Sequence, residues 1–206
     1  PEGDNIIAVM GGTTMAIVAE QLTNLENSKR HNLFVPARGG IGEAVTVQAN
    51  SVSARMATKA SGNHRALYVP EQLSLATYNS LLNEPSIQEV LNLISQANCV
   101  IHSIGRALHM AARRKMTEQE LVMLKQANAV AESFGYFFNE NGEVVYKVPR
   151  IGIELKDLAN VPIILAIAGG KSKAKAIRAY MKNAPKQTWL ITDEAAANEI
   201  LKGISL

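Results

Sequence analysis

The chain has 206 residues, of which 47% are hydrophobic and 19% charged, and its formal net charge is +3. These proportions are typical of a globular protein that is long enough to bury a core. The positive excess is mild and no dense stripe of lysine and arginine appears, so we expect no nucleic-acid binding by this chain alone.

The sequence contains a single cysteine, Cys99, which excludes an internal disulfide and a cysteine metal cluster. No spacing of the four histidines fits a metal site, and we expect no metal or cofactor. No apolar run approaches the roughly 20 residues that span a bilayer, and no signal peptide opens the chain. We therefore expect a cytoplasmic protein without a membrane partner.

Six short apolar runs are bounded by glycine, proline or polar residues, at 5–10, 32–37, 66–70, 99–105, 161–170 and 188–193. Continuous rather than alternating hydrophobicity is typical of strands buried on both faces, as in parallel sheets. Helical patterns separate them, at 15–22, 44–60, 73–82, 87–97, 118–134, 172–183 and 194–201. Strands that alternate with helices predict an α/β domain with a doubly wound, mostly parallel sheet, and we expect one domain over 1–206.

One segment interrupts this alternation. Residues 135–155 place Asn141-Gly142 between two stretches rich in β-forming residues, which is the pattern of a hairpin. We expect a small antiparallel excursion there.

Two strands run into Gly-Gly turns that open helices. The first is IIAVMGGTTM (6–15), with Thr13 and Thr14, and the second is IILAIAGGKSKAKAI (163–177), with Lys173. A helix N-terminus at the carboxyl end of a parallel strand suits a phosphate, although a plain N-cap and a tight turn explain each motif alone. Neither turn has the glycine spacing of a Walker A loop, so nucleoside triphosphate hydrolysis is disfavoured.

A third turn, VPARGGIGEAV (35–45), places Arg38 beside Gly39 and Gly40 after a strand, where a guanidinium can grip a phosphate. Gln48 and Asn50 follow in the first turns of a helix and are candidates to bind sugar hydroxyls, or else form a polar helix face.

Further candidates lie in the second half of the chain. Arg113 and Arg114 follow another strand, and Glu132 stands in an apolar setting, either to accept from sugar hydroxyls or to pair with an arginine. His102, inside a strand pattern, is interpreted as a core histidine. Asp193-Glu194 begins the last helix as a cap and first-turn carboxylate, with an acid/base pair as the alternative.

Six blocks in order, AVMGGTTM, LFVPARGGIGE, VQANSVSARMA, AESFGYFFNENGEVVYK, IAGGKSKAKAI and ITDEAAA, resemble the effector-binding domain of SorC-family bacterial transcription regulators. The resemblance runs from about Asn5 to the C-terminus. It implies a Rossmann-like fold related to sugar-phosphate isomerases and deaminases, used for sensing, and fructose-1,6-bisphosphate or a related glycolytic phosphosugar as effector.

Transferred to this sequence, the resemblance assigns Gly12, Thr13, Thr14 and Lys173 to one phosphate. Arg38, Gly39, Gly40 and Arg113 would meet the other phosphate region, with Arg114 as an alternative to Arg113. Gln48, Asn50 and Glu132 would meet sugar hydroxyls.

The resemblance also implies a homo-oligomer, a dimer or tetramer, that controls binding to operator DNA. In this family a DNA-binding module and a first sheet strand precede the domain, and we expect both to lie before Pro1. Ser103 and His109 depart from the residues common in the family, near Arg113. The alternative is a sugar-phosphate isomerase or deaminase on the same fold.

Overall fold

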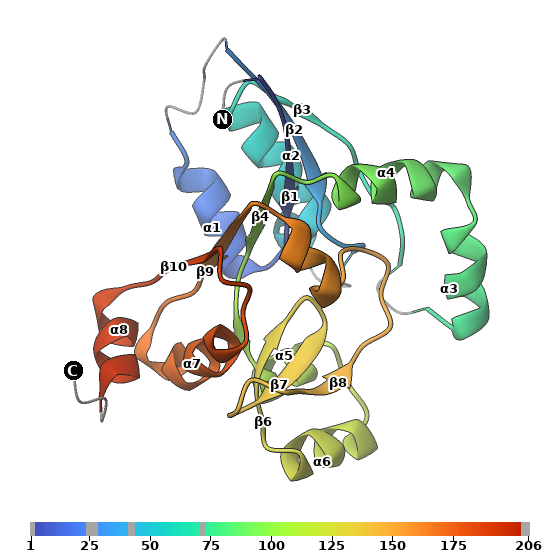
Figure 1. Cartoon of the computed structure of the whole chain (residues 1–206). Coiled ribbons are helices and arrows are strands. Elements are labelled where there is room, and N and C mark those ends of the chain that lie inside the picture. Colours follow the sequence, from blue (N-terminus) through green and yellow to red (C-terminus); the bar gives the residue numbers. More distant parts are fainter. Residues whose placement is uncertain (1–2, 24–28, 41–43, 71–72, 203–206) are drawn as a thin grey trace. The chain divides into compact units, whose positions relative to one another are not determined.

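The computed structural model describes residues 3–23, 29–40, 44–70 and 73–202. The chain folds as two compact units, residues 1–102 with 149–165, and residues 103–148 with 166–206. Strand β9 (Ile163–Ile167) runs from the first unit into the second. Figure 1 labels the elements along the chain.

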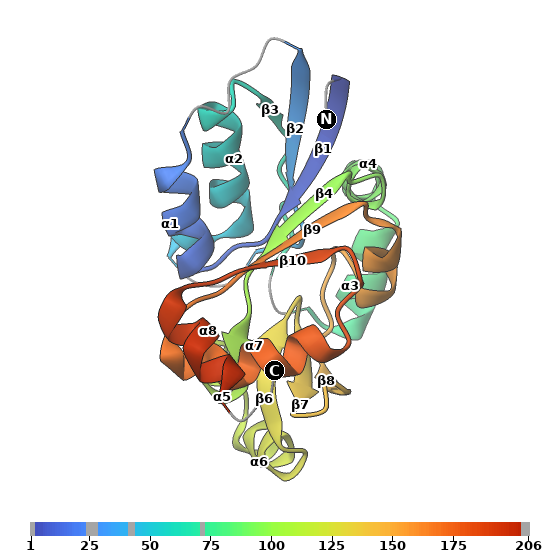
Figure 2. The same ribbon diagram turned by 60° about the vertical axis from the view of Figure 1, so that its left-hand side comes forward.

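Six strands form one sheet in the order β10-β9-β4-β1-β2-β3 (Figures 1 and 2). Strand β1 (Gly3–Val9) pairs in parallel with β2 (Arg30–Pro36) and with β4 (Cys99–His102), and β2 pairs in parallel with β3 (Asn63–His64). Because β4 and β2 flank β1 on opposite sides, the chain winds in both directions from β1. The predicted doubly wound parallel sheet is confirmed.

In the first unit, helices cover both faces of the strands. Helices α1 (Thr13–Gln21) and α2 (Ala49–Lys59) lie side by side (Figure 2) and share a core with β1 and β2 that includes Met15 and Met56. Helix α4 (Pro85–Ser95) contacts β1 and β2 separately from that pair, and α3 (Leu75–Leu82) precedes it. Two short 3₁₀ helices, η1 (Val45–Val47) and η2 (Leu155–Asn160), complete this unit.

The predicted strand at 66–70 does not form. Leu67 and Val69 are buried as that pattern requires, but the segment is irregular and β3 ends at His64. Its backbone groups form hydrogen bonds outside the sheet. The Asn50 side chain accepts from Leu67 N–H and donates to Leu67 C=O, and Val69 C=O accepts from Gly40 N–H. Leu67 and Val69 are buried without a sheet partner, whereas Tyr68 between them is 83% exposed.

The second unit holds an antiparallel sheet of its own, in the order β5-β6-β7-β8. The strands are β5 (Gly105–Arg106), β6 (Ala129–Ser133), β7 (Tyr136–Asn139) and β8 (Val144–Lys147). The predicted hairpin around Asn141-Gly142 is confirmed as β7-β8, but it belongs to this four-stranded sheet and is more than an excursion of the main sheet. The predicted helix over 118–134 is wrong beyond Gln126, because Asn128 adopts a positive φ of 51° and the chain continues as β6.

Helices pack on both faces of this small sheet. Phe137 is buried with residues of α5 (Ala107–Arg113) and α6 (Glu118–Gln126), whereas Phe138 meets Tyr180 of α7 (Ala174–Lys182) edge to face, with ring centroids 5.6 Å apart. Consecutive strand residues point to opposite faces, which explains this division. The unit also contains η3 (Lys171–Lys173), β10 (Thr188–Ile191) and α8 (Glu194–Leu201). In the part of the chain that the structure describes, no helix is both long and apolar enough to cross a membrane.

Candidate functional site

The GGTT turn of the first unit opens α1 without a side-chain cap. Gly12 is the N-cap residue, at φ 119° and ψ 163°, and no side chain accepts a hydrogen bond from the first turn. The alternative of Thr13 or Thr14 as an ordinary N-cap is therefore wrong. The first-turn N–H groups of α1 have no intrahelical partner, as in any helix, and they lie beside two threonine hydroxyls.

The same turn contacts the start of α2. Gly12 N–H donates to Val47 C=O at 2.7 Å, immediately before Gln48, which is the N-cap residue of α2. Thr13, Thr14 and Gln48 are thus held on neighbouring turns at the carboxyl end of β1. The N–H of Gly12 is already used in this contact, so the groups left to meet an anion are those that follow it.

Arg38 lies one strand further along the same edge of the sheet. Ala37 N–H donates to Val9 C=O at 2.8 Å, which ties the end of β2 to the end of β1, and Arg38 itself is 4% exposed. Gly39 and Gly40 donate to Ile151 C=O and Val69 C=O, at 2.9 and 3.2 Å. A Cβ at Gly39 would overlap the Val69 side chain, so packing explains this glycine. Ile41, Gly42 and Glu43 of this turn lie outside the described residues.

Asn50 has a structural role that the sequence did not indicate. Its amide nitrogen donates to Leu67 C=O at 3.1 Å and its oxygen accepts from Leu67 N–H at 2.9 Å. Both ends of the amide are thus engaged by the backbone of the irregular segment. A contact of Asn50 with a sugar hydroxyl stays a prediction, and this geometry does not favour it.

The second unit gathers three cations from three elements. Lys173 ends η3, Arg113 lies in the last turn of α5, and Arg106 ends β5. Burial lowers the pKa of the Lys173 ammonium below its ordinary value of 10.5, and the positive charges of Arg106 and Arg113 lower that pKa further. We call Arg106, Arg113 and Lys173 the cation cluster. Because like charges repel, such a cluster is suited to an anion.

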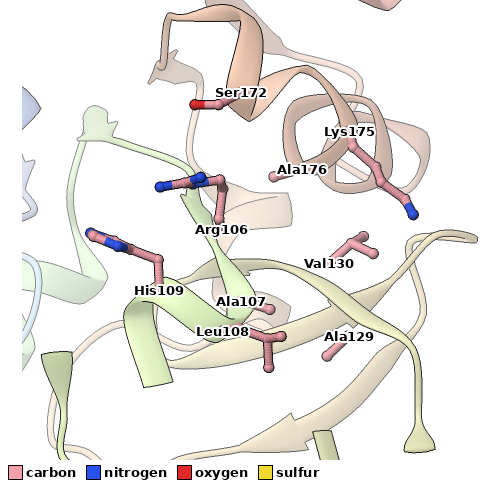
Figure 3. A pocket seen from close by; sticks show the side chains of 9 residues that line it. All are labelled: Arg106, Ala107, Leu108, His109, Ala129, Val130, Ser172, Lys175 and Ala176. Atoms are coloured by element: carbon pink, nitrogen blue, oxygen red, sulfur yellow. The ribbon is translucent and has the colours of Figure 1, made fainter. Parts of the chain in front are cut away.

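Arg106 of the cation cluster also lines a pocket of about 300 Å³ (Figure 3). Arg106 and His109 lie along one side, Ser172 lies above, and Lys175 of α7 lies opposite Arg106. Apolar side chains of α5, β6 and α7 complete its wall, namely Ala107, Leu108, Ala129, Val130 and Ala176. Arg106 and Lys175 were not predicted as site residues, since the sequence pattern drew attention to the Arg113-Arg114 pair and to the Gly-Gly turns.

Arg113 and Arg114 have different environments. The guanidinium of Arg114 donates to Glu132 at 2.8 Å and stands 5.8 Å from the centroid of the Phe137 ring. The Arg114 and Glu132 side chains are 3% and 5% exposed, and the same Glu132 oxygen accepts from Gly135 N–H at 2.7 Å. Of the two roles considered for Glu132, the structure shows the ion pair with an arginine. It also favours Arg113, whose charge acts on Lys173, over Arg114 as the anion-binding arginine.

Asp193 braces the GGKS turn. Its carboxylate caps α8 by accepting from Ala196 N–H at 2.8 Å and also accepts from Gly170 N–H at 2.6 Å. The interpretation of Asp193 as a helix cap is confirmed. The N–H of Gly170 is therefore occupied by Asp193.

Two further observations bear on catalysis. His102 is fully buried, as expected of a core histidine. Across the described residues, no group of three or more histidine, cysteine, aspartate or glutamate side chains is arranged to hold a metal ion.

Residues 2–202 match the family model Sugar-bind, which describes a sugar-binding domain. The chain belongs to this sugar-binding domain family. A crystal structure of a SorC family transcriptional regulator from Enterococcus faecalis shares 79% sequence identity over 98% of this chain and 81% of that one, with a TM-score of 0.92. The predicted resemblance to SorC-family regulators is thereby confirmed.

Curated relatives of this sugar-binding domain are longer proteins. It is 51% identical over 200 residues to the central glycolytic genes regulator of Bacillus subtilis, covering 97% of this chain and 58% of that protein. The regulator of the same name in Priestia megaterium is 50% identical, with 57% of its length covered. The full-length sorbitol operon regulator SorC of Klebsiella pneumoniae, at 17% identity and a TM-score of 0.84, shares the fold.

Thr13, Thr14, Arg38 and Gln48 of this sugar-binding domain belong to the first compact unit, and Arg113, Glu132 and Lys173 to the second. In the first unit, the Gly12–Val47 hydrogen bond holds Thr13, Thr14 and Gln48 on neighbouring turns. In the second unit, the charge of Arg113 acts on Lys173, whereas Glu132 pairs with Arg114. A joint grip of Lys173 and the GGTT turn on one phosphate stays a prediction.

Proposed function

We propose that this chain is the effector-binding domain of a bacterial repressor of glycolytic genes, and that its effector is fructose-1,6-bisphosphate or a related glycolytic phosphosugar. The cation cluster carries this proposal. Burial, and after it the charges of Arg106 and Arg113, lower the pKa of the Lys173 ammonium, and such a group of positive side chains in one unit is suited to a phosphate. The curated relatives named as glycolytic regulators support the choice of effector class.

The first unit supplies a second set of groups of the same kind. Thr13, Thr14 and the first turn of α1 offer hydroxyl and N–H donors, and Arg38 follows the adjacent strand. A bisphosphate carries two anionic groups, so the proposal assigns donors in both units to it. Gln48, at the N-cap of α2, is assigned to a sugar hydroxyl.

Effector binding would alter the association of the domains in a homo-oligomer and, through a DNA-binding segment outside this chain, the affinity for operator DNA. The chain spans less than two thirds of the length of the two curated glycolytic regulators, which leaves room for such a segment in them.

Calorimetry with fructose-1,6-bisphosphate tests the site. We expect Arg38→Ala and Lys173→Ala each to weaken binding at least tenfold, about 1.4 kcal/mol. Lys125→Ala, which removes an exposed lysine from the end of α6, is the matched control and should bind normally. Unchanged affinity in both test variants would remove these residues from the site.

A panel of phosphosugars tests the effector class. A ligand at 100 times its dissociation constant adds roughly 2.7 kcal/mol to the free energy of unfolding, which a thermal shift detects. No shift with any phosphosugar would contradict the proposal. Sustained conversion of a hexose phosphate would instead favour the alternative of an isomerase or deaminase.

A further inference from the structure

The pocket of about 300 Å³ in the second unit differs in its lining from the proposed phosphate site. Arg106 belongs to both, whereas Arg113 and Lys173 of the cation cluster do not line the pocket. The described residues that line it all belong to the second unit, so its shape depends on that unit alone. The pocket can therefore be considered as a site for a ligand of its own.

Regular elements hold the wall of this pocket. Arg106 pairs with Ala131 where β5 meets β6, and Ala107 begins α5 directly after it. Val130 lies in β6, and Ala176 is buried in the first turn of α7. Because strands and helices fix the backbone of these residues, the fold itself forms the pocket, as is usual for small-molecule sites.

Polar and apolar side chains occupy different parts of the pocket. In Figure 3, Arg106, His109 and Ser172 extend toward the same side, whereas Lys175 extends in the opposite direction. Small apolar side chains lie between these two ends, namely Ala107, Val130 and Ala176. The pocket thus has a cationic end, formed by Arg106, His109 and Ser172, and an apolar floor.

The cationic end is not neutralised by other groups in the part of the chain that the structure describes. There, the side chains of Arg106, His109 and Ser172 form no hydrogen bond and no ion pair. Lys175, at the opposite end, differs because its ammonium pairs with Glu140, and this contact lowers the pKa of the Glu140 carboxyl. The charge of Arg106 is therefore available to an anionic ligand.

We propose that this pocket binds a small organic acid, with its carboxylate at the cationic end and a flat, apolar body on the apolar floor. A guanidinium such as that of Arg106 meets both oxygens of a carboxylate with two parallel hydrogen bonds. His109 and Ser172 each carry a further group that can donate. The apolar body is stabilised by its removal from water against the alanine and valine side chains.

A sugar does not match this lining. Sugar hydroxyls donate hydrogen bonds and need acceptors, yet no aspartate, glutamate, asparagine or glutamine is found among the described residues that line the pocket. Hydroxyls placed against the apolar floor would lose their hydrogen bonds to water without replacement, which costs free energy. The ligand class therefore differs from a phosphosugar, and the inference does not rest on the proposed effector.

Benzoate is a suitable probe, because it joins a carboxylate to a flat apolar ring. The experiment adds benzoate to the isotopically labelled chain and follows the backbone amide signals by NMR. We expect saturable shifts at Ala107, Val130 and Ala176, with a dissociation constant of about 0.1 to 1 mM, as for other ligands of this size. Shifts that do not saturate, or that lie elsewhere in the chain, would overturn the proposal.

Three further compounds test the two parts of the ligand. Benzamide keeps the shape of benzoate without its charge, and acetate keeps the charge without the ring. We expect each to bind at least tenfold more weakly than benzoate. Inorganic phosphate should also bind more weakly in this pocket. Acetate or benzamide as tight as benzoate would refute the class of ligand, and phosphate as tight as benzoate would assign the pocket to phosphate instead.

Variants test the residues of the pocket. Arg106→Gln should weaken benzoate binding at least tenfold, whereas the control Arg30→Gln, which changes an exposed arginine at the start of β2, should bind normally. Val130→Phe fills the floor with a larger side chain and should also weaken binding at least tenfold. Circular dichroism confirms that each variant is folded. Normal benzoate binding in folded Arg106→Gln or Val130→Phe would refute the site.

This inference and the proposed function can fail separately. Lys173→Ala should weaken the binding of fructose-1,6-bisphosphate but change that of benzoate by no more than about twofold, since Lys173 does not line the pocket. Val130→Phe should have the reverse effect. Normal effector binding without any benzoate binding would refute the organic-acid pocket alone. Loss of benzoate binding in folded Lys173→Ala would place the carboxylate in the cation cluster and refute a separate site.

Discussion

The carboxylate of Asp193 accepts a hydrogen bond from the backbone N–H of Gly170 at 2.6 Å, and thereby joins the end of β10 to the turn after β9. The same side chain caps α8 through Ala196 N–H. One residue thus orders the GGKS turn and starts the last helix. Gly169 has to be glycine for this contact, since a Cβ there would overlap the Asp193 carboxylate.

Replacement of Asp193 should therefore lower the free energy of unfolding by more than the loss of an ordinary N-cap does. Loss of an N-cap side chain costs about 1 kcal/mol, and loss of a second hydrogen bond adds a similar amount. We expect Asp193→Ala to lower the free energy of unfolding by about 2 kcal/mol in urea denaturation. In Asp193→Ser the hydroxyl can still cap the helix but cannot accept from both Ala196 N–H and Gly170 N–H. The decrease in unfolding free energy should therefore be smaller than in Asp193→Ala. An equal loss in the two variants would contradict a double role.

Arg113 and Arg114 should respond in opposite ways to substitution. Arg114→Ala leaves the buried Glu132 carboxylate without its arginine, and breaking such a pair costs about 3–5 kcal/mol of unfolding free energy. Arg113→Ala should change stability by less than about 0.5 kcal/mol, as for most surface positions, yet weaken phosphosugar binding at least tenfold. Denaturation and calorimetry on both variants test this. A destabilised Arg113→Ala with normal binding would reverse the two roles.

The lowered pKa of Lys173 predicts how the free chain responds to alkaline pH. Below its folded pKa, Lys173 is charged in both the folded and the unfolded state, and repulsion from Arg106 and Arg113 opposes folding. As pH rises through that pKa toward 10.5, the unfolded state holds more protons, so this residue contributes rising stability. We expect the unfolding free energy of Lys173→Met to lack this rise, measured against wild type over the alkaline range.

Deprotonation of Lys173, which should raise the stability of the free chain, should weaken the binding of phosphate. The anion interacts with the charged ammonium, so affinity should fall at a pH below the ordinary lysine pKa of 10.5. In Lys173→Arg the guanidinium stays charged, and its affinity should stay flat over that range. Calorimetry at several pH values measures both profiles. Parallel profiles for wild type and Lys173→Arg would assign the pH dependence to another group.

Asn50 and Gln48 separate support of the fold from contact with a ligand. Asn50→Ala removes both hydrogen bonds to the Leu67 backbone and leaves buried polar groups, so it should destabilise the chain by about 1–3 kcal/mol. Gln48→Ala should have a smaller effect on stability and a larger one on phosphosugar affinity. Urea denaturation and calorimetry measure the two effects. Equal stability losses would place Gln48 among the structural residues.

Much of the architecture was predictable from the pattern of apolar runs. Strands buried on both faces leave continuous hydrophobic segments, and β1, β2, β4, β9 and β10 formed where such segments occur. The run at 66–70 misled because Leu67 and Val69 are buried against a loop, and burial looks the same in sequence whatever bonds the backbone makes. Helix α6 ended early because Asn128, a residue type that tolerates the left-handed region, follows its C-cap at a positive φ.

By itself, the sequence determined the alternation of strands and helices, the hairpin at Asn141-Gly142 and the turns that carry the candidate site, because these depend on local chemistry and on periodicity. Only the tertiary structure decided which charges meet. Arg113 and Arg114 are neighbours in sequence, yet the charge of Arg113 acts on Lys173 and Arg114 is buried against Glu132, since consecutive residues at a helix end point in different directions. In the same way, Asp193 could be recognised as a cap, but its bond to Gly170 required β9 and β10 to bring two distant turns together.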